Sequence, residues 1–235
     1  MTIRMACISV AACVMVGAAE TAPDAVVADT DSYRIAVENA YVRVLELRAE
    51  AGHNSPLHAH PPRAVVVLSG ARVRLTRPDG TSELVDRKPG DVFWSDAEEH
   101  RLVVVAGSLH EIETEIKGAI PPRFAPSAKD VTDITPELAR VIYENASVRV
   151  LDLRGEPGQQ FPFHFHQARA TIRLGSSRMK FVERNGTTRM ADFHPGEVTW
   201  GEAVEHSDAV MSGSFHLVLV EIKGQAVPGR PTDAK

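Results

Sequence analysis

Several stretches of the chain alternate apolar and charged residues in the way that half-buried β-strands do. The segments VRVLELR at 42–48 and VRVLDLR at 148–154 both show this period of two. AVVVLSG at 64–70 and RVRLTRPDGT at 72–81 read as two further strands, the second running into a turn. Neither half of the chain shows the longer period of a long amphipathic helix. Many short strands at regular spacing predict an all-β protein built as a small barrel or a sandwich.

The strand pattern occurs twice along the chain. Placing each residue against the one 106 positions later aligns 34–118 with 140–224 without a gap, and EIKG ends both copies. Asp79-Gly80 in the first copy and Asn185-Gly186 in the second stand at matching positions, and both dipeptides favour hairpin turns. Self-similarity at a fixed offset predicts an internal duplication, so we expect two tandem domains of the same fold.

The segments around the two copies differ from them in composition. Residues 119–137 include four prolines and little apolar periodicity, which predicts a linker. Residues 20–32 are small and polar and read as a flexible lead-in, and the polar tail at 226–235 is expected to be flexible as well. The predicted domains therefore cover 33–118 and 138–225.

The first 19 residues have the pattern of a secretory signal peptide. One positive charge is followed by a short apolar run and by small residues before Glu20. We expect a periplasmic or secreted mature chain with no membrane association after cleavage. The sequence VAAC, which ends at Cys13, also fits a lipoprotein box, so anchoring at Cys13 is an alternative. An ordinary buried N-terminal segment is the third interpretation.

Composition narrows the chemistry that is available. The net charge is -5 and the sequence has no basic stripe, which argues against nucleic acid as a partner. Both cysteines, Cys7 and Cys13, fall in the predicted leader. A mature chain without cysteine has no disulfide framework, no thiol nucleophile and no cysteine-based zinc site. A transition-metal site would have to use histidines and carboxylates.

A histidine pair is the main functional feature of each copy. Two histidines separated by one residue lie on the same face of a β-strand, as a metal site built on a strand requires. A third histidine follows 40 residues after each pair. The first set is His58, His60 and His100, and the second set is His164, His166 and His206.

These residues resemble the motifs of the cupin superfamily. Its first motif has the form G-x5-H-x-H-x3,4-E-x6-G, and its second opens with a Pro-Gly-Asp-type turn and ends in a histidine. The resemblance covers both copies and implies a bicupin: two jelly-roll β-barrels, each with a potential metal site inside. The matching residues are Gly52, His58, His60, Pro89-Gly90-Asp91 and His100 in the first copy, and Gly158, His164, His166, Pro195-Gly196-Glu197 and His206 in the second.

The chain departs from the family pattern at the usual fourth ligand. The glutamate of the first motif is missing, since the two ways of counting lead to Arg63 or Ala64, and to Arg169 or Ala170 in the second copy. We therefore expect His-only sites in one or both barrels. Three neutral imidazoles can bind Fe, Mn, Ni, Cu or Zn and leave positions open for water and substrate. The competing interpretation is a barrel that has lost its metal.

Two further pairs of residues are candidates for a catalytic role. His110 and His216 share strand parity with apolar residues, and would point inward if that apolar face lines the barrel. A core histidine with a hydrogen-bond partner is the alternative. Arg63 and Arg169 could hold a substrate carboxylate, and a salt bridge to a neighbouring strand is the alternative for them.

The phenylalanines around the second histidine pair predict a contact surface. Phe161, Phe163 and Phe165 alternate with the histidines, so we expect them on the outer face of the barrel. An apolar stripe there needs cover, either from the other barrel or from a second subunit in a homodimer.

The sequence as a whole favours an exported bicupin with a His-only divalent-metal site in one or both barrels. Its partner would be a small organic molecule, with acidic molecules among the candidates. A dioxygenase-like cupin oxidoreductase is the expected class if the protein is an enzyme. A non-catalytic periplasmic protein that binds a small ligand or the metal itself is the alternative.

Overall fold

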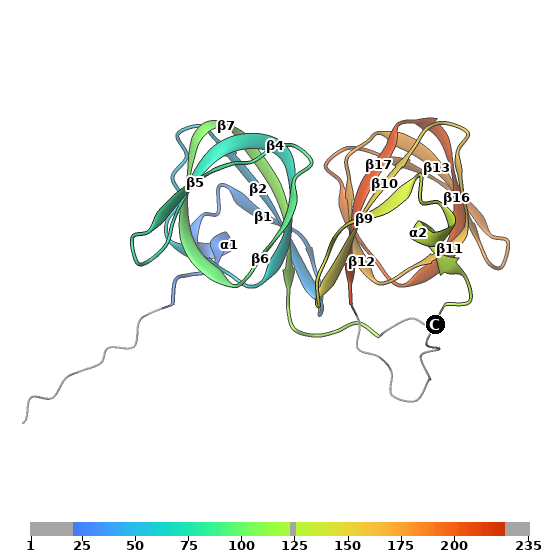
Figure 1. The fold of residues 1–235 in the computed structure, drawn as a ribbon, viewed down its shortest axis with the longest axis horizontal. Helices are drawn as coiled ribbons and strands as arrows, with labels where there is room; N and C mark the ends of the chain where they lie inside the picture. The colour runs from blue at the N-terminus through green and yellow to red at the C-terminus, as the bar shows by residue number, and fades with distance from the viewer. Residues whose placement is uncertain (1–20, 123–125, 224–235) are drawn as a thin grey trace, which may run out of the picture.

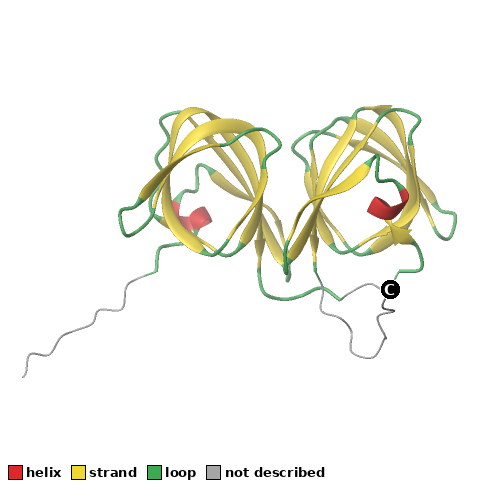
Figure 2. Ribbon diagram, in the orientation of Figure 1, coloured by secondary structure: helices red, strands yellow, loops and turns green. Residues whose placement is uncertain are grey.

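The computed structural model describes residues 21–122 and 126–223, which form two β-barrels side by side (Figure 1). The described chain is almost entirely strand and loop, with two one-turn helices (Figure 2). The prediction of an all-β chain with two tandem barrels is therefore confirmed. The predicted signal peptide at 1–19 and the tail at 226–235 lie outside the described residues. No described helix has the length and apolar character needed to cross a bilayer.

The first barrel is one continuous seven-stranded sheet. Its strand order is β1-β2-β7-β4-β5, with β3 paired to β7 and β6 paired to β4. The two longest strands, β4 and β7, each take part in both halves of the barrel. The strands are β1 (Tyr33–Glu38), β2 (Val42–Glu50), β3 (His58–His60), β4 (Arg63–Thr76), β5 (Ser82–Asp86), β6 (Val92–Ser95) and β7 (Glu98–Ile116).

The second barrel divides the same path into two five-stranded sheets, β15-β12-β17-β10-β9 and β14-β13-β16-β11-β8. Each long strand of the first barrel corresponds to two strands here. The strands are β8 (Lys129–Asp130), β9 (Ala139–Glu144), β10 (Val148–Gly155), β11 (Gln160–His166), β12 (Arg169–Arg173), β13 (Ser177–Glu183), β14 (Thr188–Phe193), β15 (Val198–Gly201), β16 (Val204–Gly213) and β17 (Phe215–Ile222).

A glycine marks the place where the long strand bends in both barrels. Gly107 within β7 has φ +89°, and Gly213 at the end of β16 has φ +78°. A Cβ at Gly213 would lie 2.2 Å from the carbonyl oxygen of Ser176, so a side chain has no room there. The positive φ and the close backbone approach both require glycine.

The predicted hairpins are confirmed. Strand β4 pairs with β5 up to Thr76 and Ser82, and β13 pairs with β14 up to Val182 and Thr188. Gly80 and Gly186 take positive φ in the turns between them, as the Asp-Gly and Asn-Gly dipeptides predicted.

Each barrel begins earlier in the chain than its predicted boundary. Helix α1 (Ala25–Ala28) follows Asp24, whose backbone forms a bridge with Ala59 of β3. Helix α2 (Val131–Ile134) follows Asp130, which belongs to β8 and pairs with β11. The two segments stand 106 residues apart, so the duplication includes them. Part of the predicted lead-in and part of the predicted linker therefore belong to the barrels.

The two barrels pack together through an apolar layer that contains residues from both. The outward residues of β2, β4 and β7 contact those of β10, β12 and β17 in one buried cluster. Tyr41 of the first barrel stacks on Trp200 of the second, with ring centroids 5.8 Å apart. The cluster includes Val42, Val44, Ala64, Val66, Ile112, Val148, Val150, Ala170, Ile172, Val218, Val220 and Ile222.

This layer explains why alternate residues of the last strand in each barrel are apolar. Ile112 and Val218 face the other barrel and not the barrel interior. The opposite face of β7 carries the buried residues Glu111, Glu113 and Glu115 into the first barrel. The apolar parity of this strand therefore marks the contact between barrels, because that contact excludes water as completely as a core does.

The prediction of an outer phenylalanine stripe is wrong at one position. Phe161 is buried in the core of the second barrel, where its ring lies 5.4 Å from that of Phe215. The register of β11 shifts between Phe161 and His164, which turns Phe161 to the inner face. Phe163 and Phe165 remain half-buried, and the guanidinium of Arg184 lies 4.5 Å above the ring of Phe163.

Candidate functional site

The three histidines of each copy meet inside their barrel. The pair comes from one strand, and the third histidine lies directly across from it, since His58 pairs with His100 and His164 with His206. All six side chains are buried. In each set, one nitrogen from each ring lies within 4.8 Å of the others, a spacing that could hold a metal ion. Strand alternation and register thus bring together what the sequence spacing predicted.

In each set, a chain of charged groups lies against Nδ1 of one histidine. In the first barrel, Arg43 joins Asp24 at 2.5 Å and Glu115 at 2.6 Å, and Glu115 lies 3.0 Å from Nδ1 of His60. A carboxylate accepts hydrogen bonds only, so Nδ1 of His60 carries the proton. The Nε2 lone pair is left to face the other histidines.

The second barrel repeats this arrangement. Arg149 joins Asp130 at 2.5 Å and Glu221 at 2.7 Å, and Glu221 lies 3.4 Å from Nδ1 of His166. Such outer partners set the tautomer and the orientation of ligating histidines in metalloproteins. Sequence reasoning missed the network, because it links residues that are far apart in the chain.

The first histidine of each pair is fixed by the backbone. Nδ1 of His58 lies 2.9 Å from the carbonyl oxygen of Pro56, and Nδ1 of His164 lies 2.7 Å from that of Pro162. A carbonyl oxygen is an acceptor, so Nδ1 donates and Nε2 is again the nitrogen without a proton. Burial lowers the pKa of both histidines, that of His58 to about 4.

Tyr33 closes the histidine set of the first barrel. Its hydroxyl lies 3.4 Å from Nε2 of His58 and 3.5 Å from Nε2 of His60, and its side chain is buried. Burial, with nearby Glu113, raises the pKa of Tyr33 well above its ordinary value, so the hydroxyl keeps its proton. Ala139 stands at the equivalent position of the second barrel.

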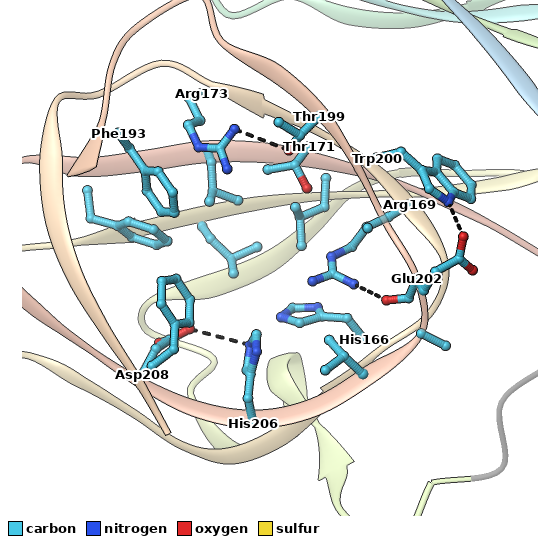
Figure 3. A pocket seen from close by; sticks show the side chains of 18 of the residues that line it. His166, Arg169, Thr171, Arg173, Phe193, Thr199, Trp200, Glu202, His206 and Asp208 are labelled. Atoms are coloured by element: carbon cyan, nitrogen blue, oxygen red, sulfur yellow. Dashed lines mark hydrogen bonds and ion pairs between the residues drawn. The ribbon is translucent and has the colours of Figure 1, made fainter. Parts of the chain in front are cut away.

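The second set lies against a cavity. Its volume is about 380 Å³, and it is bordered by His166 and His206 (Figure 3). The figure shows Arg169 beside His166, and Asp208 on the other side of His206. The lining also includes Thr171, Arg173, Phe181, Arg189, Phe193, Thr199, Trp200, Phe215, Leu217 and Leu219. A volume at the small end of the usual range for ligand sites suits a small organic molecule.

Asp208 is a buried carboxyl group in this cavity that sequence reasoning did not single out. Its Oδ2 lies 3.5 Å from Nε2 of His206, and its Oδ1 has no hydrogen-bond partner among the described residues. Burial raises the pKa of Asp208 to about 7. Comparison of the two copies marks this position, since the first copy has Leu102 there.

Arg63 and Arg169 occupy equivalent places on the inner walls, while Ala64 and Ala170 face the other barrel. Arg63 forms ion pairs with Glu98 and Glu113, each at 2.9 Å. The salt bridge considered from the sequence therefore exists in the first barrel. Arg169 lines the cavity of the second barrel instead.

His110 and His216 lie away from both histidine sets. Nε2 of His110 is 2.9 Å from Glu46, and Nε2 of His216 is 2.8 Å from Asp152. Both histidines line one groove between the barrels. The two histidines share the apolar face of their strands, and that face forms the contact between the barrels. They therefore do not point into the barrel interiors.

The fold resembles solved structures of cupin proteins. No protein-family profile and no curated protein matches the sequence. A variant of oxalate decarboxylase from Bacillus subtilis superposes with a TM-score of 0.55 at 12% identity, over 85% of this chain and 77% of that one. AerE from Microcystis aeruginosa superposes with a TM-score of 0.53 at 15% identity, over 82% of this chain and 97% of that one.

The chain has the fold of a bicupin. At these identities the likeness establishes the fold alone. The function depends on the residues of the two sites, because one fold can host many chemistries.

Proposed function

We propose that this protein is a metal-dependent bicupin whose second barrel holds a divalent transition metal at His164, His166 and His206. There it would act on a small organic molecule as a dioxygenase-type oxidoreductase. The observation that carries this proposal is the 3.0 Å separation of Nε2 of His164 from Nε2 of His166.

Two imidazole nitrogens at this distance either share a hydrogen bond, with the proton on one Nε2, or bind one cation together. Nδ1 of His164 donates to a carbonyl oxygen, so Nε2 of His164 carries a lone pair, whereas Nδ1 of His166 lies 3.4 Å from Glu221 and makes no hydrogen bond among the described residues. When His166 carries its proton on Nδ1, toward Glu221, both Nε2 lone pairs point at each other. Two lone pairs in a buried site repel unless a proton or a metal ion joins them.

Of the two possible cations, a metal ion fits this position better than an added proton. Burial and the nearby Arg169 lower the pKa of His166 well below its ordinary value, so protonation is unfavourable. Two nitrogens at about 2.1 Å from one ion and about 90° apart are separated by about 3.0 Å, a spacing typical of octahedral sites. Three imidazole ligands leave further coordination positions open.

The metal would supply redox or Lewis-acid chemistry at the cavity wall. The protein would bind and orient the organic molecule and limit access of water, since the histidines are buried and the cavity is bordered by aromatic and aliphatic side chains. The solved oxalate decarboxylase includes one structure described for its Mn(II) centres, so manganese belongs among the metals to be tested.

The first barrel would hold its metal in a closed site. Tyr33 occupies the space in front of His58 and His60, and the interior beyond it is filled by the ion pair of Arg63 with Glu113. Closed metal sites are typical of structural roles, and open ones of catalysis. This favours a stabilising metal in the first barrel and chemistry in the second.

Elemental analysis of the purified, untagged protein tests the metal sites. After loading separately with Fe(II), Mn(II), Ni(II), Cu(II) or Zn(II), we expect up to two ions per chain, and one in a His166→Ala variant. Less than about 0.2 ion per chain with every metal would refute the proposal. That threshold lies far below the full occupancy expected of three-imidazole sites.

A non-catalytic binding protein is the second candidate function. The closed first site favours it, because a metal there would have no adjoining space for a substrate. Oxygen uptake by the iron-loaded protein with a panel of small organic acids separates the two functions. Uptake that depends on both the acid and His166 supports the enzyme, whereas tight binding without uptake supports the binding protein.

Export is proposed from the N-terminal sequence alone. The expected product in a Gram-negative host is a periplasmic protein that has lost about 18 or 19 residues. Mass spectrometry of the recovered protein measures the cleavage position, and a lipid-modified Cys13 would instead indicate an anchored lipoprotein.

Light scattering of the same sample tests the predicted homodimer.

A further inference from the structure

The duplicated arginines have different partners in the two barrels. From this difference we propose that Arg169 binds the carboxylate of the ligand in the second barrel, and that the ligand is a monocarboxylate with an apolar body. The inference rests on the proposed function for the role of the site, and it names the class of molecule that the site accepts.

In the first barrel, the equivalent Arg63 is paired with carboxylates of the protein itself. Its guanidinium is buried and pairs with Glu113 on β7 and with Glu98, each at 2.9 Å. Two carboxylates of the protein itself thus neutralise Arg63. Although Nε and Nη1 of Arg63 make no hydrogen bond among the described residues, the charge of Arg63 is balanced within the protein.

Arg169 lacks both of these carboxylates. The equivalents of Glu98 and Glu113 are Val204 and Leu219, which line the cavity. Among the described residues, no ion pair with Arg169 within 4 Å is found. Asp208 and Glu221 favour its charge only through longer-range attraction.

The hydrogen bonds of Arg169 also leave donors free. Nη1 donates to the carbonyl oxygens of Gln167 and Glu202, at 3.2 and 3.1 Å. Nε is buried and has no hydrogen-bond partner within the described part of the chain. Burial lowers the pKa of Arg169 to about 10, yet the group remains charged at neutral pH. A buried guanidinium with a free donor is costly unless an anion completes its hydrogen bonds.

The position of Arg169 suits a ligand that also reaches the histidines. Arg169 and His166 lie side by side on the cavity wall (Figure 3). The planar fork of a guanidinium matches a carboxylate, which can accept two parallel hydrogen bonds from it. An anion held there would lie next to the proposed metal position.

The rest of the cavity is suited to an apolar body. Its aromatic and aliphatic lining includes Leu153, Phe181, Phe193, Phe215, Leu217 and Leu219. The other two arginines of the wall lie over aromatic rings, Arg173 4.0 Å from the ring centre of Phe193 and Arg189 4.2 Å from that of Phe181. Benzoate combines one carboxylate with a flat apolar body and is therefore the probe of choice.

Calorimetric titration of the full-length zinc-loaded protein with benzoate tests the proposal. We expect one benzoate per chain, with much weaker binding of the neutral isostere benzamide and of acetate, which lacks the apolar body. The Arg169→Met variant should lose about 10- to 100-fold in benzoate affinity, the range expected for hydrogen bonds to a charged group.

A second variant keeps Arg169 but gives it a carboxylate partner inside the barrel, so that Arg169 is no longer available to a ligand. Leu219→Glu places in the second barrel the carboxylate that Glu113 supplies in the first, so Arg169 should pair internally and benzoate affinity should fall to a similar extent. The matched control is the double variant Arg63→Met/Glu113→Leu. It removes both members of the first-barrel ion pair and should leave benzoate affinity unchanged.

The outcomes separate this inference from the proposed function. Benzoate affinity that is equal in the wild type, Arg169→Met and Leu219→Glu would overturn the inference, as would tighter binding of inorganic phosphate or of benzamide. Zinc content is measured on the same samples and reports on the metal site alone. If zinc is absent but benzoate binding still depends on Arg169, the proposed function fails while the carboxylate site stands.

Discussion

The two barrels share one fold and one set of three histidines, yet their interiors differ in kind. The first barrel fills the space around its histidines with Tyr33 and with carboxylates that pair with Arg63. The second replaces Tyr33 by Ala139 and Glu113 by Leu219, and a cavity lies against its histidines. The imidazoles alone do not distinguish the barrels. The residues that surround them decide which site is open.

The comparison also shows what an open site requires. The first barrel pairs its buried arginine with two carboxylates, whereas among the described residues Arg169 of the second barrel has no carboxylate within ion-pair distance. An unsatisfied buried group costs stability, and such costs are typical of binding sites. The second barrel therefore leaves room and an unpaired cation for the proposed ligand, whereas Tyr33 and ion pairs fill the first.

The largest expected effect is the loss of metal from one barrel at a time. We expect His60→Ala and His166→Ala each to lower the affinity of one site by more than about 100-fold, since removal of a ligand exceeds the effect of losing an outer partner. Each single variant should retain one ion per chain, and the double variant none, by elemental analysis. Full metal content in either single variant would contradict the assignment of that barrel.

The equivalent arginines should respond in opposite ways to the same substitution. Arg63→Met leaves Glu113 buried without its cation and should lower the free energy of unfolding by about 3–5 kcal/mol. Arg169→Met removes a guanidinium that lacks an anion and should change it by less than about 1 kcal/mol, or raise it. Denaturant titration of both metal-free, ligand-free variants checks this. Equal losses would remove the distinction between the barrels.

A buried glutamate should make the stability of the first barrel depend on pH. Burial raises the pKa of Glu111 from an ordinary 4.5 to about 7, so the folded state favours the protonated form. This stabilisation is complete below about pH 4.5 and is lost as the pH rises through 7, by up to about 3 kcal/mol.

Asp208 in the second barrel also has a raised pKa, so the pH test is made in the Asp208→Asn background. In the metal-free protein, Glu111→Gln should flatten the fall in the free energy of unfolding between pH 5 and 8. An unchanged slope would show that Glu111 ionises normally.

The smallest expected effect concerns the hydroxyl of Tyr33. Tyr33→Phe removes two contacts to imidazole nitrogens and should lower the free energy of unfolding by about 1 kcal/mol. In the cobalt-loaded protein the same variant should bind a second azide, because the first site becomes open, and visible spectroscopy counts the bound azide. Tyr143→Phe, at the edge of the second barrel, is the control and should bind one. A single azide in both variants would mean that Tyr33 does not close the site.

Much of the fold and the histidine sets could be predicted because both depend on local sequence. Period-two alternation places His58 and His60 on one strand face, and the Asp-Gly and Asn-Gly turns fix the hairpins. The duplication supplied a second, independent copy of each signal. The sequence predicts too little structure in the lead-in and the linker, because the one-turn helices at 25–28 and 131–134 carry almost no periodic pattern.

The orientation of the last strand could not be predicted, because two apolar environments compete for it. The alternation of β7 shows that one face is buried, but the contact between barrels and the barrel interior both exclude water. The sequence therefore predicts an inward His110 only on condition that the apolar face lines the barrel, and it does not single out the buried Glu113. The register shift in β11 similarly moved Phe161 inward without a local signal.

The sequence by itself determined the all-β class, the tandem duplication and the pairing of histidines, since each follows from spacing within a short segment or from a constant offset. Only the tertiary structure decided that Tyr33 meets His58, that Arg63 meets Glu113, and that Arg169 meets a cavity. Those contacts join residues that lie tens of positions apart on different strands. They depend on how a barrel closes, and two copies with the same histidine spacing can close around different interiors.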